Sequence, residues 1–129
     1  GEARLARERA GRLGDGWYPV GNNPNALFDT PERYANGLKD VHETAIASDR
    51  NPAKIACGIY IIWYNLGQTE HDSLGKRRSF TGSAQDILRD IAAYEKIGLQ
   101  HLVIGGESDN LEACLQRMRV FNKEVMQYV

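Results

Sequence analysis

The run from Ile55 to Trp63 limits the possible folds of this chain more than any other segment. Its sequence, Ile-Ala-Cys-Gly-Ile-Tyr-Ile-Ile-Trp, does not alternate polar with apolar residues. A strand that is apolar on both sides is covered on both faces, which is typical of a parallel sheet inside an α/β fold. The run is also far shorter than the ~20 residues that a membrane span needs. We therefore expect a buried parallel strand here, and no membrane span.

Two further short strands are predicted, and helices separate all three. The first strand covers residues 17–20 and the third covers residues 101–104. One helix is predicted over residues 2–13, and Gly14-Asp15-Gly16 ends it. The closing helix carries a long apolar stripe, made of Leu111, Leu115, Met118, Phe121, Val125 and Tyr128. Strands that alternate with helices pair in parallel through right-handed crossovers.

Capping signals place the two middle helices. One begins near Asp29 or Thr30, where Asp29 and Glu32 have a spacing like that of a capping box, and it ends before Asp49. The other begins at Ser83, which is followed by Asp86 three residues later, and ends at Gly98. The residues from 64 to 79 are polar and are expected to form a long connection.

This element count predicts an incomplete architecture. Three parallel strands form neither a comfortable open sheet nor a closed barrel, and a (β/α)8 barrel needs eight strands and about 250 residues. The chain has 129 residues and opens directly on a helix. We therefore expect it to be the C-terminal piece of something larger, with about three parallel strands and four helices.

The composition narrows the classes of partner and compartment. Sixteen basic residues face seventeen acidic ones, so the net charge of −1 offers no bulk field for a nucleic-acid backbone. Cys57 and Cys114 lie in separate apolar runs and are expected to be buried thiols rather than a disulfide pair, which fits a reducing cytoplasm. The arginine-rich start of the chain lacks the apolar core of a signal peptide.

Several segments, in order along the whole chain, resemble the luciferase-like monooxygenase family. Residues 9–17, RAGRLGDGW, resemble its RAARLGDGW segment, and residues 49–52, DRNP, resemble its GRDP turn. Residues 81–87, TGSAQDI, resemble its GTPEEV helix start, and residues 93–104 resemble its YAEAGVDHLVL stretch. The closing helix, with Phe121, Glu124 and Val125, is similar to the C-terminus of the family.

The resemblance implies a (β/α)8 barrel enzyme. Such an enzyme uses reduced flavin mononucleotide (FMN) with oxygen, or a deazaflavin coenzyme, to oxidise or reduce a small organic substrate. The chain is then expected to supply barrel strands six to eight, with strands one to five absent. The resemblance also implies a cofactor phosphate near Gly1 and Arg4, although the arginines of residues 4–12, with Glu2 and Glu8 among them, favour a solvated helix face.

The carboxyl ends of barrel strands hold the working residues, and this rule selects candidates for cofactor binding. Trp17 and Trp63 lie at or near such ends. An indole offers a flat contact to a flavin ring, so one or both tryptophans wall the cofactor pocket or pack under a loop. Ser83, Gly105 and Gly106 precede helices, where free N–H groups bind phosphate or are simply capped.

His71 is the one catalytic candidate. It lies in the connection after the second strand, close to the basic run Lys76-Arg77-Arg78. A histidine titrates near neutrality and can move a proton, and the basic run can steer an anion. The alternative is an ordinary solvated loop residue. No spacing of histidine, cysteine and carboxylate residues suggests a metal site.

Two hypotheses for function follow. The first is a flavin- or deazaflavin-dependent luciferase-like oxidoreductase in the cytoplasm, in which the cofactor supplies the chemistry. The second is a non-catalytic, half-barrel-like module that acts by association, because exposed strand edges and helix faces must be covered. Both hypotheses predict a homo-oligomer or association with the missing N-terminal half of a barrel.

Overall fold

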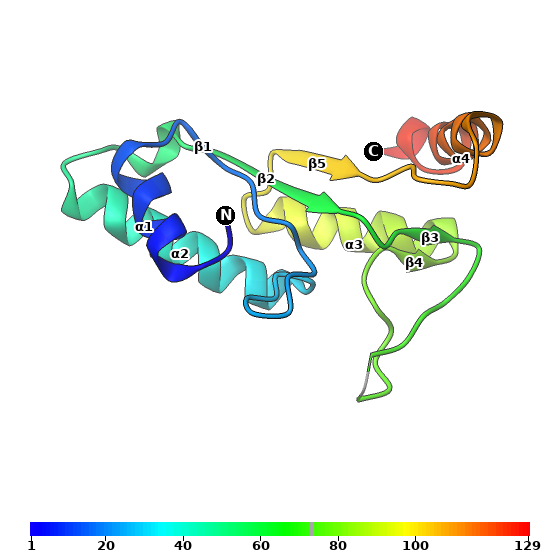
Figure 1. The fold of residues 1–129 in the computed structure, drawn as a ribbon, viewed down its shortest axis with the longest axis horizontal. Helices are drawn as coiled ribbons and strands as arrows, with labels where there is room; N and C mark the ends of the chain where they lie inside the picture. Colours follow the sequence, from blue (N-terminus) through cyan, green and yellow to red (C-terminus); the bar gives the residue numbers. More distant parts are fainter. Residues whose placement is uncertain (73) are drawn as a thin grey trace.

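A computed structural model describes residues 1–72 and 74–129. Helices and strands alternate along most of the chain, and three strands follow one another between the second and third α-helices, as Figure 1 shows. The helices are α1 (Arg4–Leu13), α2 (Pro31–Ala47), α3 (Ala84–Lys96) and α4 (Leu111–Glu124), with short 3-10 helices η1 (Pro52–Lys54) and η2 (Met126–Tyr128). The strands are β1 (Gly16–Trp17), β2 (Ala56–Ile61), β3 (Asn65–Leu66), β4 (Thr81–Gly82) and β5 (His101–Ile104).

The main sheet has three strands in the order β1-β2-β5. Both of its pairings are parallel, with Trp17 opposite Cys57 and Ile59 opposite Leu102. The long apolar run therefore forms the central strand, as its lack of alternation predicts. The predicted α/β arrangement, with three parallel strands in the main sheet and four α-helices among the described residues, is confirmed.

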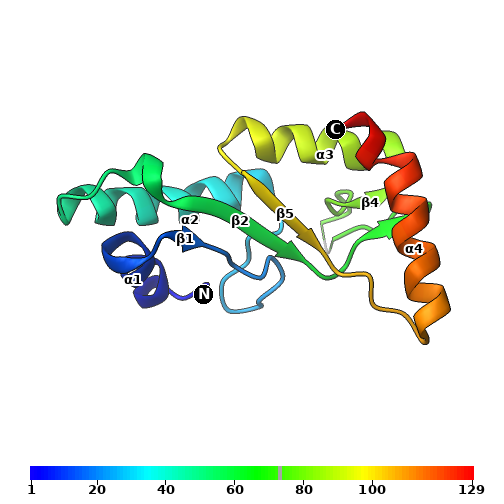
Figure 2. The same ribbon diagram turned by 90° about the horizontal axis from the view of Figure 1, so that it is seen from above.

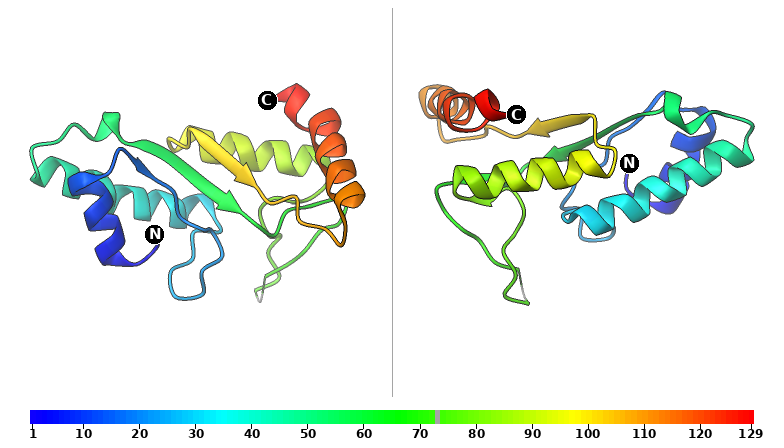
Figure 3. Two further views of the ribbon diagram at one scale, coloured as in Figure 1. Left: turned by 45° about the horizontal axis from the view of Figure 1, so that its top comes forward. Right: turned by 180° about the vertical axis from the view of Figure 1, so that it is seen from behind.

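The hydrophobic core lies between this sheet and the helices α2 and α3, which cover the same side of it (Figures 1 and 2). Cys57, Ile59 and Ile61 point from β2 into this core and are buried. Alternate residues of a strand point to opposite faces, so Gly58, Tyr60 and Ile62 belong to the other side. Figure 3 shows the sheet from two further directions, with α1 packed along α2.

Capping accounts for the ends of the middle helices. Ser83 and Asp86 form the predicted capping box at the start of α3. Thr30, rather than Asp29, caps α2, because its side chain accepts a hydrogen bond from the Arg33 N–H. The Asp29 carboxylate bonds to the guanidinium of Arg33 instead, so the predicted box between Asp29 and Glu32 is wrong. Gly98 follows α3 with a φ of 101°, a conformation that glycine adopts at low cost.

Three features differ from the sequence-based expectations. Strand β1 is shorter than the predicted residues 17–20, because Pro19 has no N–H to donate, although Val20 rejoins the sheet in a bridge with Tyr60. The connection after β2 contains the small parallel pair β3-β4, which no periodicity indicates. Helix α4 contains no fully buried residue, so its apolar stripe stays largely uncovered.

Candidate active site

Two loops meet at the carboxyl end of β2. The Gly21 N–H after β1 donates to the carbonyl oxygen of Tyr60 at 3.0 Å, and the Gly105 N–H after β5 donates to that of Ile61 at 2.8 Å. These bonds continue the parallel ladders beyond the regular strands. The carboxyl ends of the three strands are therefore held side by side, which is where barrel enzymes of this type carry their working residues.

The sheet face opposite α2 and α3 is open in the part of the chain that the structure describes. Its exposed apolar side chains include Tyr18, Ile62 and Val103, which are 42%, 38% and 46% exposed. Tyr18 lies directly over Gly58, where an added Cβ would be 2.1 Å from the Tyr18 ring. The Tyr18 and His101 rings are 5.9 Å apart. The result is a flat surface with aromatic and aliphatic groups and an adjoining imidazole.

Tyr60 adds a polar group to this face, at its carboxyl end. The Tyr60 hydroxyl donates to Oε1 of Glu107 at 3.4 Å, which joins the end of β2 to the loop after β5. The Tyr60 hydroxyl also borders Gly105, since a Cβ on that glycine would lie 3.3 Å from it. A phenol beside a carboxylate can hold or donate a proton at a defined position.

The two tryptophans lie away from this open face. Trp17 is 1% exposed and packs between the rings of Phe28 and Tyr34, with centroids 5.2 Å away in each case. Trp63 is also buried, and its indole N–H donates to the Ser79 carbonyl at 2.9 Å. Whether either ring also contacts a cofactor stays a prediction.

The candidates that precede helices, Ser83, Gly105 and Gly106, differ in how their hydrogen-bonding groups are used. The Ser83 hydroxyl donates to the Asp86 carboxylate at 2.6 Å and accepts the Asp86 N–H at 3.2 Å, so it serves as a cap. The Ser83 hydroxyl and the Ser83 backbone N–H, the latter at 2.9 Å, both donate to the Asp86 carboxylate and hold the pKa of Asp86 below its ordinary value, because they favour the charged form. Gly105 uses its N–H within the sheet, and Gly106 borders Cys114 and Met118 of α4.

His71 and the basic run lie in the connection between β3 and β4, which extends away from the main sheet (Figure 1). His71 is exposed and forms an isolated bridge with Arg77. Arg77 binds Asp90 through two guanidinium nitrogens at 2.9 and 2.6 Å. Arg78 pairs with Glu70 at 3.2 Å and lies over the Trp63 ring. Both arginines therefore pair with carboxylates and hold this connection against the rest of the protein. Much of the positive charge that the sequence offers for steering an anion is neutralised by these pairs.

The amino-terminal candidate is also paired internally. Arg4 is largely exposed and forms an ion pair with Glu8 at 3.0 Å, one turn along α1. Neighbouring Glu2 accepts hydrogen bonds from the Val20 N–H at 2.8 Å and the Asn23 amide at 3.1 Å. Burial alone would raise the pKa of Glu2, but these bonds outweigh it and hold the pKa below its ordinary value.

Metal and membrane criteria give two separate findings. Among residues 1–72 and 74–129, no group of three or more His, Cys, Asp or Glu side chains is arranged to hold a metal ion. Within that same part of the chain, every helix falls short of the length and apolarity that crossing a bilayer requires. Cys57 and Cys114 are both free, and burial raises the pKa of the Cys57 thiol.

Sequence reasoning did not single out the residues that line the open face. Tyr60 lies within the apolar run of β2. Because side chains alternate between the two faces of a strand, Tyr60 points to the face opposite to that of its neighbours Ile59 and Ile61. His101, which begins β5, also lies beside Tyr18 on the open face. Treating 55–63 as two faces instead of one buried run would have found Tyr60.

Comparisons with known proteins give structural matches only. No family model matches the chain, and no curated protein matches it. The chain is similar to the coenzyme F420-dependent tetrahydromethanopterin reductase from Methanopyrus kandleri, with a TM-score of 0.74 and 10% identity over 99% of this chain and 49% of that chain. It is also similar to an F420-dependent secondary alcohol dehydrogenase in complex with an F420–acetone adduct. That match has a TM-score of 0.67 and 13% identity over 98% of this chain and 46% of that chain.

These matches bear on the fold. The chain spans about half the length of both solved proteins. Nearly all of its own residues align with them, over 99% and 98% of this chain. The resemblance is confirmed at the level of the fold alone: the chain shares the fold of about half of each of these two solved enzymes.

Proposed function

We propose that residues 1–129 are the C-terminal segment of a luciferase-like barrel oxidoreductase that works with a deazaflavin coenzyme on a small organic substrate. The observation that carries this proposal is the fold match over 98–99% of the chain to two enzymes whose names specify coenzyme F420. The identities of 10% and 13% leave the substrate open. The open sheet face is the proposed site.

The residues of this face fit one wall of a pocket for a flat, partly polar ring. Tyr18 and Val103 offer exposed apolar surface, and such surface lines most cofactor pockets. Tyr60 and Glu107 add hydrogen-bonding groups at its carboxyl end, and the His101 imidazole lies beside Tyr18 at the start of β5. A deazaflavin, when bound, supplies or accepts a hydride. The protein side of the reaction is then to orient the ring and exclude water.

The pair of Tyr60 and Glu107 is the proposed proton-holding group. Its phenol donates to a carboxylate at 3.4 Å, so the proton sits at Tyr60 Oη with an acceptor beside it. A hydride transfer to a carbonyl leaves an alkoxide, which must take up one proton. A phenol at this edge can provide that proton, and Glu107 orients the phenol. The proton role of His71, in the connection between β3 and β4, remains a separate prediction.

Completion of the barrel belongs to the same proposal. The exposed side chains of the open face need cover, because apolar surface of this kind is unfavourable in water. The remaining barrel strands, from another segment or a partner chain, are proposed to supply the cover and the second wall. The alternative is that the protein uses FMN with oxygen in place of a deazaflavin. A titration with both cofactors distinguishes the two possibilities.

A fluorescence titration tests the proposal. Oxidised F420 is titrated with the chain, and FMN is titrated in parallel. F420 is expected to bind saturably and more tightly than FMN. Val103→Asp, which places a charge on the open face, is expected to weaken binding by about tenfold, equivalent to about 1.4 kcal/mol.

Leu111→Asp is the matched control, because Leu111 is exposed on α4 and lies outside the face. It is expected to leave F420 binding unchanged. Saturable binding of FMN, without binding of F420, would contradict the deazaflavin proposal and favour the flavin alternative. A chain that ignores both coenzymes and forms oligomers would favour the non-catalytic module and contradict the proposal.

A further inference from the structure

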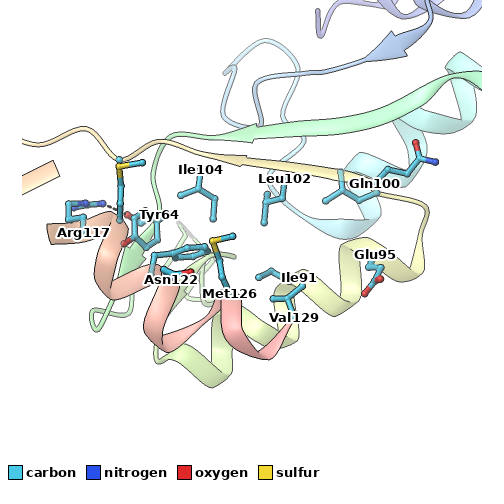
Figure 4. Close-up of a pocket in the computed structure, with 14 residues that line it drawn as sticks. Tyr64, Ile91, Glu95, Gln100, Leu102, Ile104, Arg117, Asn122, Met126 and Val129 are labelled. Atoms are coloured by element: carbon cyan, nitrogen blue, oxygen red, sulfur yellow. Dashed lines mark hydrogen bonds between the residues drawn. The ribbon is translucent and has the colours of Figure 1, made fainter. Parts of the chain in front are cut away.

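Helix α4 stands off the main sheet and leaves a large cavity. The cavity has a volume of about 790 Å³ and lies between β5, α3 and α4 with η2 (Figure 4). Met118 and Met126 on its α4 and η2 side are 57% and 59% exposed. The apolar stripe of α4 therefore faces open space instead of packed neighbours. Cavities of roughly 300–1,000 Å³ are the usual size for small-molecule sites.

Strand β5 separates this cavity from the proposed coenzyme site. Leu102 and Ile104 line the cavity, whereas Val103 between them points to the open face on the other side. Ile91 of α3 and Phe121 of α4 complete the apolar walls. Binding here is therefore physically distinct from binding on the open face and does not depend on the proposed function.

One end of the cavity carries a cation without an acidic partner. Arg117 lies there next to Tyr64 (Figure 4). Its Nη2 donates to the Tyr64 carbonyl at 3.0 Å, and its guanidinium carbon is 4.8 Å from the Tyr64 ring centroid. Its Nε is buried and has no hydrogen-bond partner among the described residues. No carboxylate of residues 1–72 or 74–129 forms an ion pair with it.

The opposite end carries the reverse charge. Glu95 and Gln100 lie there, separated from Arg117 by the apolar walls (Figure 4). An anionic group is thus favoured at the Arg117 end and disfavoured at the Glu95 end. Arg117 is half-buried, and its buried Nε has no hydrogen-bond partner among the described residues, so an anionic acceptor near this guanidinium is favoured.

We propose that this cavity binds an amphipathic carboxylate, of the class of medium-chain fatty acids. The carboxylate lies at Arg117, and the alkyl chain runs past Ile104 and Leu102 toward Val129. A polypeptide segment is a poorer occupant, because its many N–H and C=O groups would find few partners between these apolar walls. A single anionic head with an apolar tail matches the charge and the walls together.

The two methionines of the chain, Met118 and Met126, both line the cavity and provide the test. The chain is labelled with ¹³C at the methionine methyl groups and titrated with sodium decanoate at monomeric concentrations. Both methyl signals are expected to shift saturably with decanoate. Decan-1-ol is expected to bind more weakly, because it lacks the charged head.

Two variants of α4 test the role of the charge. Arg117→Gln is expected to weaken decanoate binding roughly tenfold or more, and to leave decanol binding within about twofold. Arg119→Gln is the matched control, because Arg119 is exposed and pairs with Glu112 at 3.1 Å. It is expected to leave both ligands unaffected. Circular dichroism verifies that each variant is folded.

Three results would overturn the proposal. The first is the absence of a saturable shift at either methionine in the wild-type chain, a result that no folding defect of a variant can obscure. The second is equal affinity for decanoate in wild type and Arg117→Gln. The third is a methionine shift that follows protein concentration and ignores decanoate, which would make the cavity an interface between copies of the chain.

Discussion

The Asp90 carboxylate ties the connection between β3 and β4 to α3, and its loss is expected to be costly. Asp90 is 8% exposed and accepts bonds from Arg77 at 2.9 and 2.6 Å and from the Phe80 N–H at 2.7 Å. Phe80 is fully buried and has a φ of 62°, an uncommon conformation for a non-glycine residue. Asp90→Ala removes the acceptor for all three bonds.

The expected loss of stability follows from the hydrogen-bonding groups that Asp90→Ala leaves without a partner. Breaking a fully buried ion pair costs about 3–5 kcal/mol, but the Arg77 side chain is 28% exposed and regains water. Its share is therefore discounted to about 1–2 kcal/mol. The buried Phe80 N–H, left without an acceptor, costs about 1–2 kcal/mol more. We expect Asp90→Ala to lower the free energy of unfolding by about 3 kcal/mol in total.

Urea unfolding followed by circular dichroism measures this change. Asp90→Asn keeps an oxygen for the Phe80 N–H and is expected to lose only about half as much. Arg89→Ala, on the exposed face of α3, is the control and is expected to change stability by no more than about 0.5 kcal/mol. A loss below about 1 kcal/mol for Asp90→Ala would refute the reasoning that this carboxylate anchors the loop.

Three further predictions concern packing, thiol reactivity and pH. Gly21→Ala places a Cβ 2.5 Å from the buried Trp63 ring and is expected to lower the free energy of unfolding by about 2 kcal/mol. An unchanged midpoint of urea unfolding would contradict this close contact. Burial raises the pKa of Cys57, so a thiol reagent is expected to modify Cys114 first and Cys57 only on unfolding, and equal rates would argue against it. The pKa of Glu2 is held below 4.5, so its stabilisation is present above pH 4.5 and is lost as the pH falls through the lowered value. The stability difference between wild type and Glu2→Gln is therefore expected to shrink below pH 4.5, and a constant difference in urea unfolding would count against this.

The fold was largely predictable because its strongest signals are local. The unbroken apolar run of β2 requires cover on both sides, and Ser83 and Gly98 mark the ends of α3 through backbone hydrogen bonding alone. The strands β3 and β4 escaped prediction because a two-residue pair has no periodicity to detect. The short β1 reflects Pro19, which interrupts an otherwise extended segment.

The candidate site was harder to predict because it depends on contacts between distant segments. Tyr18 reaches Gly58 and His101 only after β1, β2 and β5 have paired. Arg77 looks like a free cation in the sequence, yet Asp90, thirteen residues further on, neutralises it. Trp17 and Trp63 follow the rule for strand ends, but their rings pack into the protein.

We propose that the open face of the sheet, and not the helix-covered face, receives the coenzyme. A crystal structure of the chain grown with oxidised F420 tests it most directly. The deazaflavin ring is expected to lie against Tyr18 and Val103, with the Tyr60 hydroxyl at its edge. A ring bound in the cavity beneath α4, or an open face occupied by another part of the protein while F420 binds elsewhere, would contradict it.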